Sequence, residues 1–275
     1  MVRAVALHSV VPIRREPSEA SEQLTQMLFV ETCEVIEEQP NWLLVQLDHD
    51  GEKGWADRKM LTLLSEDEYT RLKRGGNAKV VMPWALAVSE GNGQTIPLNA
   101  ATRLPYYKEG VFDVLGATFR IDPSMVINTP LALTADNVMQ TVRFFLNIPY
   151  LWGGRNAMGM DCSGFVQVLF SLFDISLPRN ASAQALEGEE VLSLEQAQAG
   201  DLVFFNHEDI DSSKKRISHV GVLIDKQTVV HCSGRVKVEK IDDNGIFSAE
   251  RADANHPKGI YTHHLALIRR FKQKQ

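Results

Sequence analysis

The sequence predicts an α+β protein in which short β-strands come first and a helix followed by an antiparallel sheet comes last. Two observations lead to this prediction. Short apolar runs separated by turn residues fill the chain to about residue 122. In contrast, residues 135–146 and 162–173 carry apolar side chains at helical spacing, and short apolar runs return after Asp174.

The 275 residues suffice for two or three small domains. Turn residues at short intervals predict a small antiparallel barrel at the start. A second strand-rich stretch contains the apolar runs Val80–Val88, Thr102–Tyr107 and Val111–Ile121. We therefore expect a first barrel over residues 1–64, a linker helix within 65–77, a second β-rich domain over 78–127 and an α+β domain over 128–275.

The linker is predicted to be helical from its two ends. Ser65 is a favoured N-cap residue, and the three acidic residues that follow it suit the positive end of a helix. The pair Gly75–Gly76 is typical of the point where a helix ends.

Composition and charge narrow the class of protein. Hydrophobic residues make up 44% and charged residues 23%, as is usual for a globular chain. The formal net charge is −6 without a long basic run, which argues against a nucleic-acid partner. No apolar segment approaches transmembrane length, and the first residues lack the features of a signal peptide. We therefore expect no membrane partner and a cytoplasmic location; export is the alternative if a signal peptide has been removed.

The three cysteines, Cys33, Cys162 and Cys232, form neither a disulfide framework nor the ligand spacing of a zinc site. We expect no metal and no cofactor. Cys33 lies in an apolar run, and strand alternation turns Cys232 away from its neighbour His231. Both are therefore predicted to be core residues.

Cys162 differs from the other two because it opens a predicted helix. Asp161 is a favourable N-cap residue, which places the Cys162 thiol in the first helical turn. The helix dipole is expected to lower the pKa of this thiol and to give a nucleophilic thiolate. Free backbone N–H groups at the same end would bind an oxyanion. The alternative is a buried structural cysteine, which the small neighbours Ser163 and Gly164 disfavour.

Two histidines are the candidate partners of this cysteine. His219 opens an apolar strand, and His231 lies on the next strand. In an antiparallel pair the two rings would lie side by side, with His219 as general base and His231 fixing its tautomer. The alternative is two ordinary histidines, one partly buried and one exposed. The other histidines are expected at the surface: His8, His49, His207, His256, His263 and His264.

Six motifs over residues 135–271 resemble the NlpC/p60 family of cell-wall cysteine peptidases. They are Pro149-Tyr150-Leu151-Trp152-Gly153-Gly154, Asp161-Cys162-Ser163-Gly164-Phe165, Pro178-Arg179-Asn180, Ala199-Gly200-Asp201-Leu202-Val203-Phe204-Phe205, Ser218-His219-Val220-Gly221 and His231-Cys232-Ser233-Gly234. Because all six keep their order and spacing, the resemblance is specific. It implies a papain-like NlpC-type catalytic domain with a triad of Cys162, His219 and His231.

The N-terminal half resembles the bacterial SH3-like barrels that precede the catalytic domain in one subgroup of this family. The motifs are Val11-Pro12-Ile13-Arg14, Ser21-Glu22-Gln23-Leu24, Asn41-Trp42 and Gly54-Trp55. The resemblance implies one or two small SH3-like β-barrels, since the second β-rich stretch matches less well. The subgroup consists of γ-D-glutamyl-L-diamino acid endopeptidases of the dipeptidyl-peptidase VI type, which act on murein peptides in cell-wall turnover or recycling. These enzymes prefer a free N-terminal L-Ala, because the first barrel closes that end of the cleft.

The resemblance also implies which residues bind the substrate ammonium. Asp161 is the predicted acid, in addition to its role as helix cap, and Glu22 is a second acid from the first barrel. Charge-assisted bonds of this kind are strong in a closed pocket. Where related proteins often carry a tyrosine near the amine, this chain has Glu52, two residues before Gly54. Either Glu52 replaces that tyrosine electrostatically or the pocket differs, so the strict need for free L-Ala stays open.

Four further residues are implied around the reacting bond. Tyr150 and Trp152 are predicted walls of the cleft, with packing in the core as the alternative. Ser163 is predicted to bind the carboxylate of D-Glu, and Asn180 to lie in a loop along the cleft.

Two other functions fit parts of the sequence. An acyltransferase or amidase would use the same cysteine and acyl-enzyme, although related acyltransferases tend to place histidine before cysteine. A non-catalytic cell-wall binding protein would not need all three triad positions, which are filled here. We expect a monomeric cysteine endopeptidase that cleaves the γ-D-glutamyl–L-diamino acid bond of a murein-derived peptide.

Overall fold

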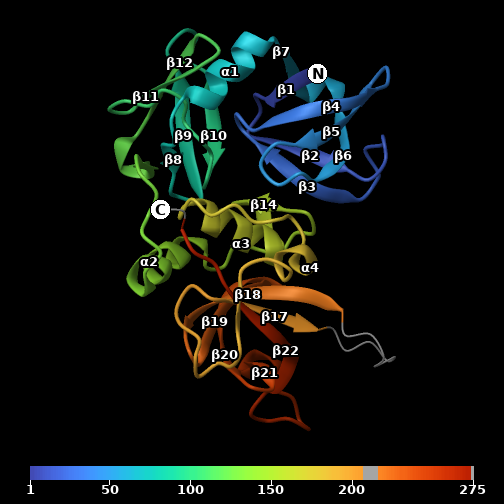
Figure 1. Cartoon of the computed structure of the whole chain (residues 1–275), viewed down its shortest axis with the longest axis vertical. Helices are drawn as coiled ribbons and strands as arrows, with labels where there is room; N and C mark the ends of the chain where they lie inside the picture. Colours follow the sequence, from blue (N-terminus) through green and yellow to red (C-terminus); the bar gives the residue numbers. More distant parts are fainter. Residues whose placement is uncertain (207–215, 274–275) are drawn as a thin grey trace. The chain divides into compact units, whose positions relative to one another are not determined.

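The computed structural model describes residues 1–206 and 216–273 and comprises two compact units (Figure 1). The first unit contains Met1–Leu131 and Leu151–Gly159, and the second contains Ala132–Tyr150 and Met160–Gln275. The chain therefore passes between the units three times. Nothing in the sequence predicts the return of residues 151–159 to the first unit, and the four predicted domain boundaries stay predictions.

An antiparallel sheet forms the first part of the first unit, in the order β3-β2-β6-β5-β4-β1-β7. Side chains alternate across it, as in β5, where Leu43, Val45 and Leu47 are buried in one core. Cys33 lies in this core, as predicted. The strands are β1 Val2–Ala6, β2 Val10–Arg14, β3 Gln23–Leu28, β4 Thr32–Glu38, β5 Trp42–Leu47, β6 Lys53–Asp57 and β7 Leu61–Leu64, with a short helix η1 at Arg58–Met60.

The predicted linker helix is present as α1, Glu66–Arg74. The Ser65 hydroxyl accepts a hydrogen bond from the Glu68 backbone N–H, and the Glu68 carboxylate accepts one from the Ser65 backbone N–H. Gly75 ends the helix, where a Cβ would lie 2.5 Å from Pro105 Cβ.

A second, four-stranded sheet has the order β10-β9-β12-β11. The predicted strand Thr102–Tyr107 is wrong, because it contains Pro105, which has no N–H, and Tyr106, whose φ is 55°. The predicted run Val111–Ile121 is a hairpin that turns at Leu115. The elements are β8 Lys79–Val80, β9 Trp84–Ser89, β10 Thr95–Asn99, β11 Val111–Val114, β12 Ala117–Ile121, η2 Pro123–Met125 and β13 Val126–Ile127, with β8 and β13 paired.

The two sheets of the first unit share a core. Val5 and Phe29 from the first part pack with Phe112 and Phe119 from the second. The rings of Phe29 and Phe119 meet edge to face at 5.9 Å between centroids, and those of Phe112 and Phe119 stack at 5.3 Å. The first two predicted β-rich domains are therefore parts of one compact unit.

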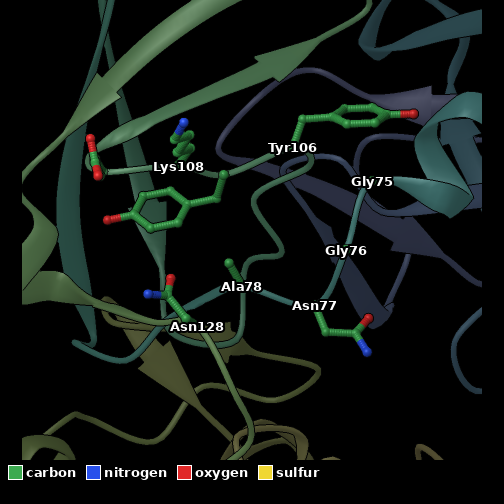
Figure 2. A pocket seen from close by; sticks show the side chains of 9 residues that line it. Gly75, Gly76, Asn77, Ala78, Tyr106, Lys108 and Asn128 are labelled. Atoms are coloured by element: carbon green, nitrogen blue, oxygen red, sulfur yellow. The ribbon is translucent and has the colours of Figure 1, made fainter.

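A surface cavity of about 370 Å³ lies where α1 ends (Figure 2). The Tyr106 ring extends toward α1, and its hydroxyl donates to the Arg71 carbonyl oxygen at 2.8 Å. The cavity is lined by Gly75, Gly76, Asn77, Ala78, Tyr106, Tyr107, Lys108, Glu109 and Asn128.

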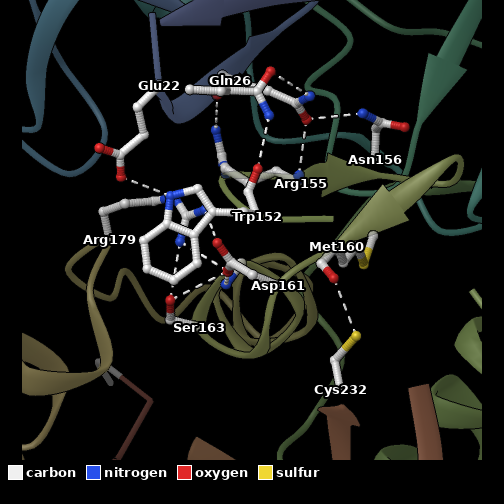
Figure 3. Close-up of polar contacts among 12 residues, drawn as sticks. Glu22, Gln26, Trp152, Arg155, Asn156, Met160, Asp161, Ser163, Arg179 and Cys232 are labelled. Carbon is white, nitrogen blue, oxygen red and sulfur yellow. Dashed lines mark hydrogen bonds and ion pairs between the residues drawn. The ribbon is translucent and has the colours of Figure 1, made fainter. Parts of the chain in front are cut away.

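Residues 151–159 are held in the first unit by buried polar contacts (Figure 3). The Arg155 guanidinium donates to the Gln26 carbonyl oxygen at 2.7 Å and to both Glu31 oxygens at 3.0 and 3.1 Å. The Gln26 amide oxygen accepts from the Arg155 backbone N–H and from the Asn156 side chain, each at 2.8 Å. Gly153 has φ +73°, and a Cβ there would lie 2.5 Å from the Gln23 carbonyl oxygen.

The second unit is built on a sheet that closes on itself. Its order is β16-β22-β17-β18-β19-β20-β21, and β21 also pairs with β22, so six strands form a barrel. Phe205, Leu223, Val229 and Ile246 fill its inner side. The strands are β16 Glu189–Val191, β17 Leu202–Asn206, β18 Ile217–Asp225, β19 Thr228–Ser233, β20 Arg235–Asp242, β21 Gly245–Ser248 and β22 Ile260–Arg270.

Helices cover β18 and β19 of this barrel (Figure 1). They are α2 Ala135–Phe145, α3 Cys162–Ser171 and α4 Ala181–Gln184, and a short helix η3 spans Ala249–Arg251. The predicted helices at 135–146 and 162–173 correspond to α2 and α3 within two residues. A short strand pair, β14 Arg155–Asn156 and β15 Gly159–Met160, precedes α3. Among the described residues, no helix is long and apolar enough to cross a membrane.

Candidate active site

The site is built around the start of α3. Asp161 is the N-cap, and its Oδ1 accepts a hydrogen bond from the Gly164 backbone N–H at 2.7 Å. Cys162 therefore occupies the first helical turn, as predicted, and only 7% of its surface is exposed. Backbone N–H groups of Val220 and Ser163 point to its sulfur. Val220 follows His219 directly, which places the sulfur beside the strand that carries this histidine.

Asp161 also forms a buried ion pair, shown in Figure 3. Arg179 Nη1 lies 3.0 Å from Asp161 Oδ1, and Nη2 lies 2.6 Å from Oδ2. Nη1 also donates to Ser163 Oγ at 2.9 Å. Because Arg179 is 2% exposed, this two-point pairing fixes the cap and the first turn of α3 from the side.

The pKa of the Cys162 thiol is shifted in the direction opposite to the predicted one. Burial, together with the nearby Asp161 carboxylate, raises this pKa to about 12. The Val220 and Ser163 N–H groups and the Arg179 charge act the other way, but their effect is smaller. The prediction of a resting thiolate is therefore wrong: position at a helix start favours the anion, and loss of hydration outweighs it.

The two predicted histidines contact each other. His219 Nε2, on β18, lies 2.8 Å from His231 Nδ1, on β19. The two rings are perpendicular, with centroids 5.0 Å apart. His231 lies opposite Gly221 in the strand register, so His219 is its diagonal neighbour on the same face. Both side chains are buried, which excludes the alternative of one exposed and one partly buried histidine.

The line of side chains continues beyond His231. His231 Nε2 lies 2.8 Å from Oε2 of the buried residue Glu239, on β20. Lys237 Nζ lies 3.0 Å from the same oxygen. In the register, His231 lies opposite Lys237 and Val229 lies opposite Glu239, so all of these side chains project to the inner side of the barrel.

Burial determines the protonation of the line. It lowers the pKa of His219 well below 6.5, and the charges of His231, His263 and Lys237 act in the same direction. It also lowers the pKa of His231, against the effect of Glu239. For Glu239, burial raises the pKa, but the neighbouring His231, Ser248 and Lys237 side chains outweigh it and hold the pKa at about 2. At neutral pH the line therefore consists of two neutral imidazoles and one carboxylate.

Gly221 makes room for this arrangement. A Cβ at this position would lie 2.7 Å from Val229 Cγ2, 2.9 Å from the Val230 carbonyl oxygen and 3.1 Å from His231 Cβ. The motif Ser-His-Val-Gly thus needs glycine because the next strand approaches closely there.

Comparison with known proteins identifies the family. The profile of the NlpC/P60 family matches residues 147–252, and that of the bacterial dipeptidyl-peptidase SH3 domain matches residues 13–61. A gamma-D-glutamyl-L-lysine dipeptidyl-peptidase of Bacillus subtilis is 32% identical over 221 residues, which cover 75% of this chain and 71% of that protein. The chain belongs to the NlpC/P60 family. It is therefore a member of a family of cysteine peptidases, as the sequence predicts.

A second relative and one solved structure are also similar to this chain. A protein of the same name from Bacillus cereus is 27% identical over 231 residues, 75% of this chain and 66% of that one. A crystal structure of an NlpC/P60 family protein from Bacillus cereus superposes with a TM-score of 0.79 at 22% identity, covering 98% of this chain and 99% of that one. The predicted α+β architecture, an NlpC-type domain after an SH3-like barrel, is thereby confirmed.

The other predicted site residues of this NlpC/P60 chain lie in both units. Tyr150 belongs to the second unit, where burial and the nearby Cys162 and Asp161 charges raise the pKa of its hydroxyl. Asn180 is exposed at the N-cap position of α4. Their catalytic or binding roles, like those of Cys162, His219 and His231, stay predictions.

Glu22 and Trp152 lie together in the first unit (Figure 3). The indole Nε1 of Trp152 donates to Glu22 Oε1 at 2.9 Å, and the Gln23 amide donates to the Trp152 carbonyl oxygen at 3.1 Å. Trp152 is 60% exposed, so core packing is excluded for this residue. Arg15 pairs with the other Glu22 oxygen at 2.7 Å.

Three features of the site escape sequence reasoning. His263 is expected at the surface before the last strand, but β22 begins at Ile260, and the His263 ring stacks on His219 with centroids 4.2 Å apart. Glu239 and Arg179 carry no role in the sequence prediction. The alternation Val236-Lys237-Val238-Glu239 after the His231 strand is the one signal that would have indicated Glu239. His207 lies outside the described residues.

Cys232 is a core residue, as predicted. It is buried, and its thiol donates to the Met160 carbonyl oxygen at 3.1 Å. Within residues 1–206 and 216–273, no group of three or more His, Cys, Asp or Glu side chains is arranged to hold a metal ion.

Proposed function

We propose that this NlpC/P60 protein hydrolyses the γ-D-glutamyl–L-diamino acid bond of murein peptides that carry a free N-terminal L-Ala. The observation that carries the proposal is the line His219–His231–Glu239 beside the capped start of α3. Cys162 at this helix start is the nucleophile, His219 is the neutral base, and His231 and Glu239 orient that base. The names of the two Bacillus relatives support the bond, and the SH3 domain profile supports the dipeptidyl mode.

The chemistry follows from the protonation of these groups. Cys162 is a neutral thiol at rest, and His219 is a neutral imidazole, so the sulfur loses its proton to His219 as it attacks the γ-carbonyl carbon. The tetrahedral oxyanion accepts hydrogen bonds from N–H groups at the start of α3. Protonated His219 then donates its proton to the leaving amine of the diamino acid. Water, deprotonated by His219, releases L-Ala-D-Glu from the thioester and restores the thiol.

The L-Ala ammonium of the substrate is proposed to bind the Glu22 carboxylate beside the Trp152 ring. Glu22 and Trp152 form an exposed carboxylate–indole pair, a combination that binds cations through charge and through the ring. An ammonium there would take the place of the exposed Arg15 side chain. Asp161 is less available, because Arg179 contacts both of its carboxylate oxygens. Ser163 is the predicted donor to the D-Glu carboxylate; in the free protein its hydroxyl donates to Asp161 and accepts from Arg179, so it would have to turn from Asp161 to the substrate.

Two pairs of synthetic peptides test the proposal. L-Ala-γ-D-Glu-L-Lys and L-Ala-γ-D-Glu-meso-diaminopimelate are each compared with the N-acetylated peptide by chromatography and mass spectrometry. We expect L-Ala-D-Glu from at least one free peptide and at least a hundredfold lower kcat/KM for its acetylated partner. Equal cleavage of free and acetylated peptides would refute the preference for L-Ala, and no cleavage of any would refute the bond.

A cytoplasmic location and a monomeric state accompany this proposal. A free L-Ala amine exists only after a stem peptide has left the glycan, which suits recycling inside the cell. Fractionation of cells and light scattering of the purified protein test the two statements.

A further inference from the structure

We propose that Glu239 is a positioning residue that acts through His231 to keep a proton off Nδ1 of His219. The inference deepens the proposed function and rests on it, because it concerns the base that serves Cys162. The residue lies on β20, beyond the two histidines, and contacts His231 and Lys237, so we place its effect on the cysteine through His231.

The line His219–His231–Glu239 is a single row of hydrogen-bond donors and acceptors. Oε2 of Glu239 lies 2.8 Å from His231 Nε2, and His231 Nδ1 lies 2.8 Å from His219 Nε2. His231 is completely buried, and Glu239 and His219 are nearly so. Water therefore does not compete for these nitrogens, and the tautomers follow from the row itself.

The direction of the row is set at its carboxylate end. A carboxylate only accepts hydrogen bonds, so His231 carries its proton on Nε2 and presents a lone pair on Nδ1. That lone pair requires a donor, so His219 carries its proton on Nε2. The remaining nitrogen of His219, Nδ1, is then unprotonated and free to accept a proton from the thiol. Reversal of the row would place a proton on Nδ1 of His219 and block the base.

The surrounding charges keep Glu239 an acceptor. Lys237, also on β20, contacts its Oε2 at 3.0 Å, and Glu250 of η3 contacts Lys237 at 3.6 Å. On the inner side of the barrel, the rings of His219 from β18, His231 from β19 and His263 from β22 lie within 5.6 Å of one another by centroid. Within the part of the chain that the structure describes, Lys237 is the lysine or arginine that pairs with this carboxylate. It offsets the buried charge, so Glu239 stays ionised and does not remove the proton from His231.

A purely structural role is a poor explanation for the buried ion pair of Glu239 with Lys237. An ion pair inside a barrel is seldom more stable than apolar side chains of the same volume, because both ions lose hydration. The core on the same inner side is formed by apolar side chains, among them Val229, Ile241 and Ile246. A carboxylate that contacts a histidine ring in this position is therefore better explained by the orientation of that ring.

The variant Glu239→Gln tests the direction of the row. Glutamine has the same shape, but its amide can either accept from His231 through Oε1 or donate to it through Nε2, so the tautomers of the two rings are no longer fixed in one direction. We expect kcat on L-Ala-γ-D-Glu-L-Lys, or on the diaminopimelate peptide if that is the one cleaved, to fall between about tenfold and a hundredfold, with KM changed less than threefold. The acid limb of the pH–rate profile should move to lower pH, because the imidazolium of His219 loses a stabilising charge. Glu239→Asp keeps an acceptor and should retain more activity.

Glu250→Gln is the matched control. Glu250 contacts Lys237 but not His231, and its side chain is about half exposed. We expect its kcat within twofold of the wild type. If Glu239→Gln does not fold, the double variant Glu239→Gln/Lys237→Met removes both charges and serves in its place. Wild-type kcat and pH profile in a folded Glu239→Gln protein would overturn the proposal.

Ring-nitrogen NMR separates this proposal from the proposed function. In protein labelled with ¹⁵N-histidine, the wild type should show His219 and His231 both protonated at Nε2 near pH 8, and Glu239→Gln should show part of the protonation of both rings at Nδ1. This measurement needs no substrate, so it remains decisive even if the peptides are not cleaved. Identical tautomers in the two proteins would overturn the positioning role, whatever the peptide assay shows.

Discussion

At the scale of single residues, the state of the Cys162 sulfur is the main departure from expectation. Burial and the Asp161 carboxylate favour the neutral thiol more than the helix start and the Arg179 charge favour the thiolate. His219 is also kept neutral. The free site therefore holds a neutral thiol and a neutral imidazole. The thiolate–imidazolium pair of Cys162 and His219 forms only when the sulfur attacks.

This state predicts a simple pH dependence for alkylation of the free protein. With a thiol pKa of about 12, the thiolate fraction rises tenfold per pH unit over the whole accessible range. We expect the rate of iodoacetamide addition at Cys162, measured by mass spectrometry, to rise from pH 6 to pH 9 without a plateau. A rate that is already constant below pH 7 would show that the thiolate exists at rest. Cys162→Ala corrects for reaction at Cys33 and Cys232.

Gly221 gives a second prediction at this scale. In Gly221→Ala the new methyl group would lie within 3.1 Å of atoms in Val229, Val230 and His231. Overpacking of this kind costs about 1–3 kcal/mol, and here the shift falls on the strand that carries His231. We expect kcat to fall at least tenfold and the melting temperature to fall by several degrees. Gly91→Ala, where the added Cβ has no contact closer than 3.9 Å, should change neither.

At the scale of elements, α1 and α3 differ in what their N-cap residues contact. Ser65 caps α1 at an exposed position with a reciprocal bond to Glu68. Asp161 caps α3 and also holds a buried arginine. The first cap can be read from the sequence alone, because it is local. The partner of the second cap cannot, because Arg179 lies eighteen residues away along the chain.

Substitution of Ser65 and of Asp161 should separate what a helix cap and what the Asp161–Arg179 ion pair contribute to the free energy of unfolding. Ser65→Ala should cost about 1 kcal/mol, the usual value of a cap. Asp161→Asn keeps an acceptor for the Gly164 N–H but removes the charge opposite Arg179, and we expect a cost of about 3–5 kcal/mol. Urea unfolding followed by circular dichroism measures both. Equal costs would show that the ion pair adds nothing to the cap.

At the scale of the whole molecule, the sequence predicts local features well and long-range ones poorly. The α1 helix, the capped Cys162, the paired histidines and the core positions of Cys33 and Cys232 follow from patterns a few residues long. The motifs extend this to the family, because their order and spacing are specific. Glu239, the stacking of His263 and the return of residues 151–159 depend on strand register and on contacts between distant segments, which no local pattern encodes.

The return of residues 151–159 has a consequence for truncated proteins. Arg155 is 3% exposed because Gln26 and Glu31 of the first unit surround it. A fragment comprising residues 132–275 lacks both partners, so Arg155 and its neighbours would lose their hydrogen bonds. We expect hydrogen exchange of residues 151–159 to become fast in the fragment, although it is slow in the full chain. Equal protection in both would contradict the assignment of this segment to the first unit.

The most direct test compares wild type with Cys162→Ala on L-Ala-γ-D-Glu-L-Lys and on the diaminopimelate peptide. We expect release of L-Ala-D-Glu by the wild type and a rate at least a thousandfold lower for the variant, with an unchanged circular dichroism spectrum and a melting temperature within a few degrees of the wild type. A folded Cys162→Ala protein that cleaves the peptide at a rate close to that of the wild type would contradict this expectation.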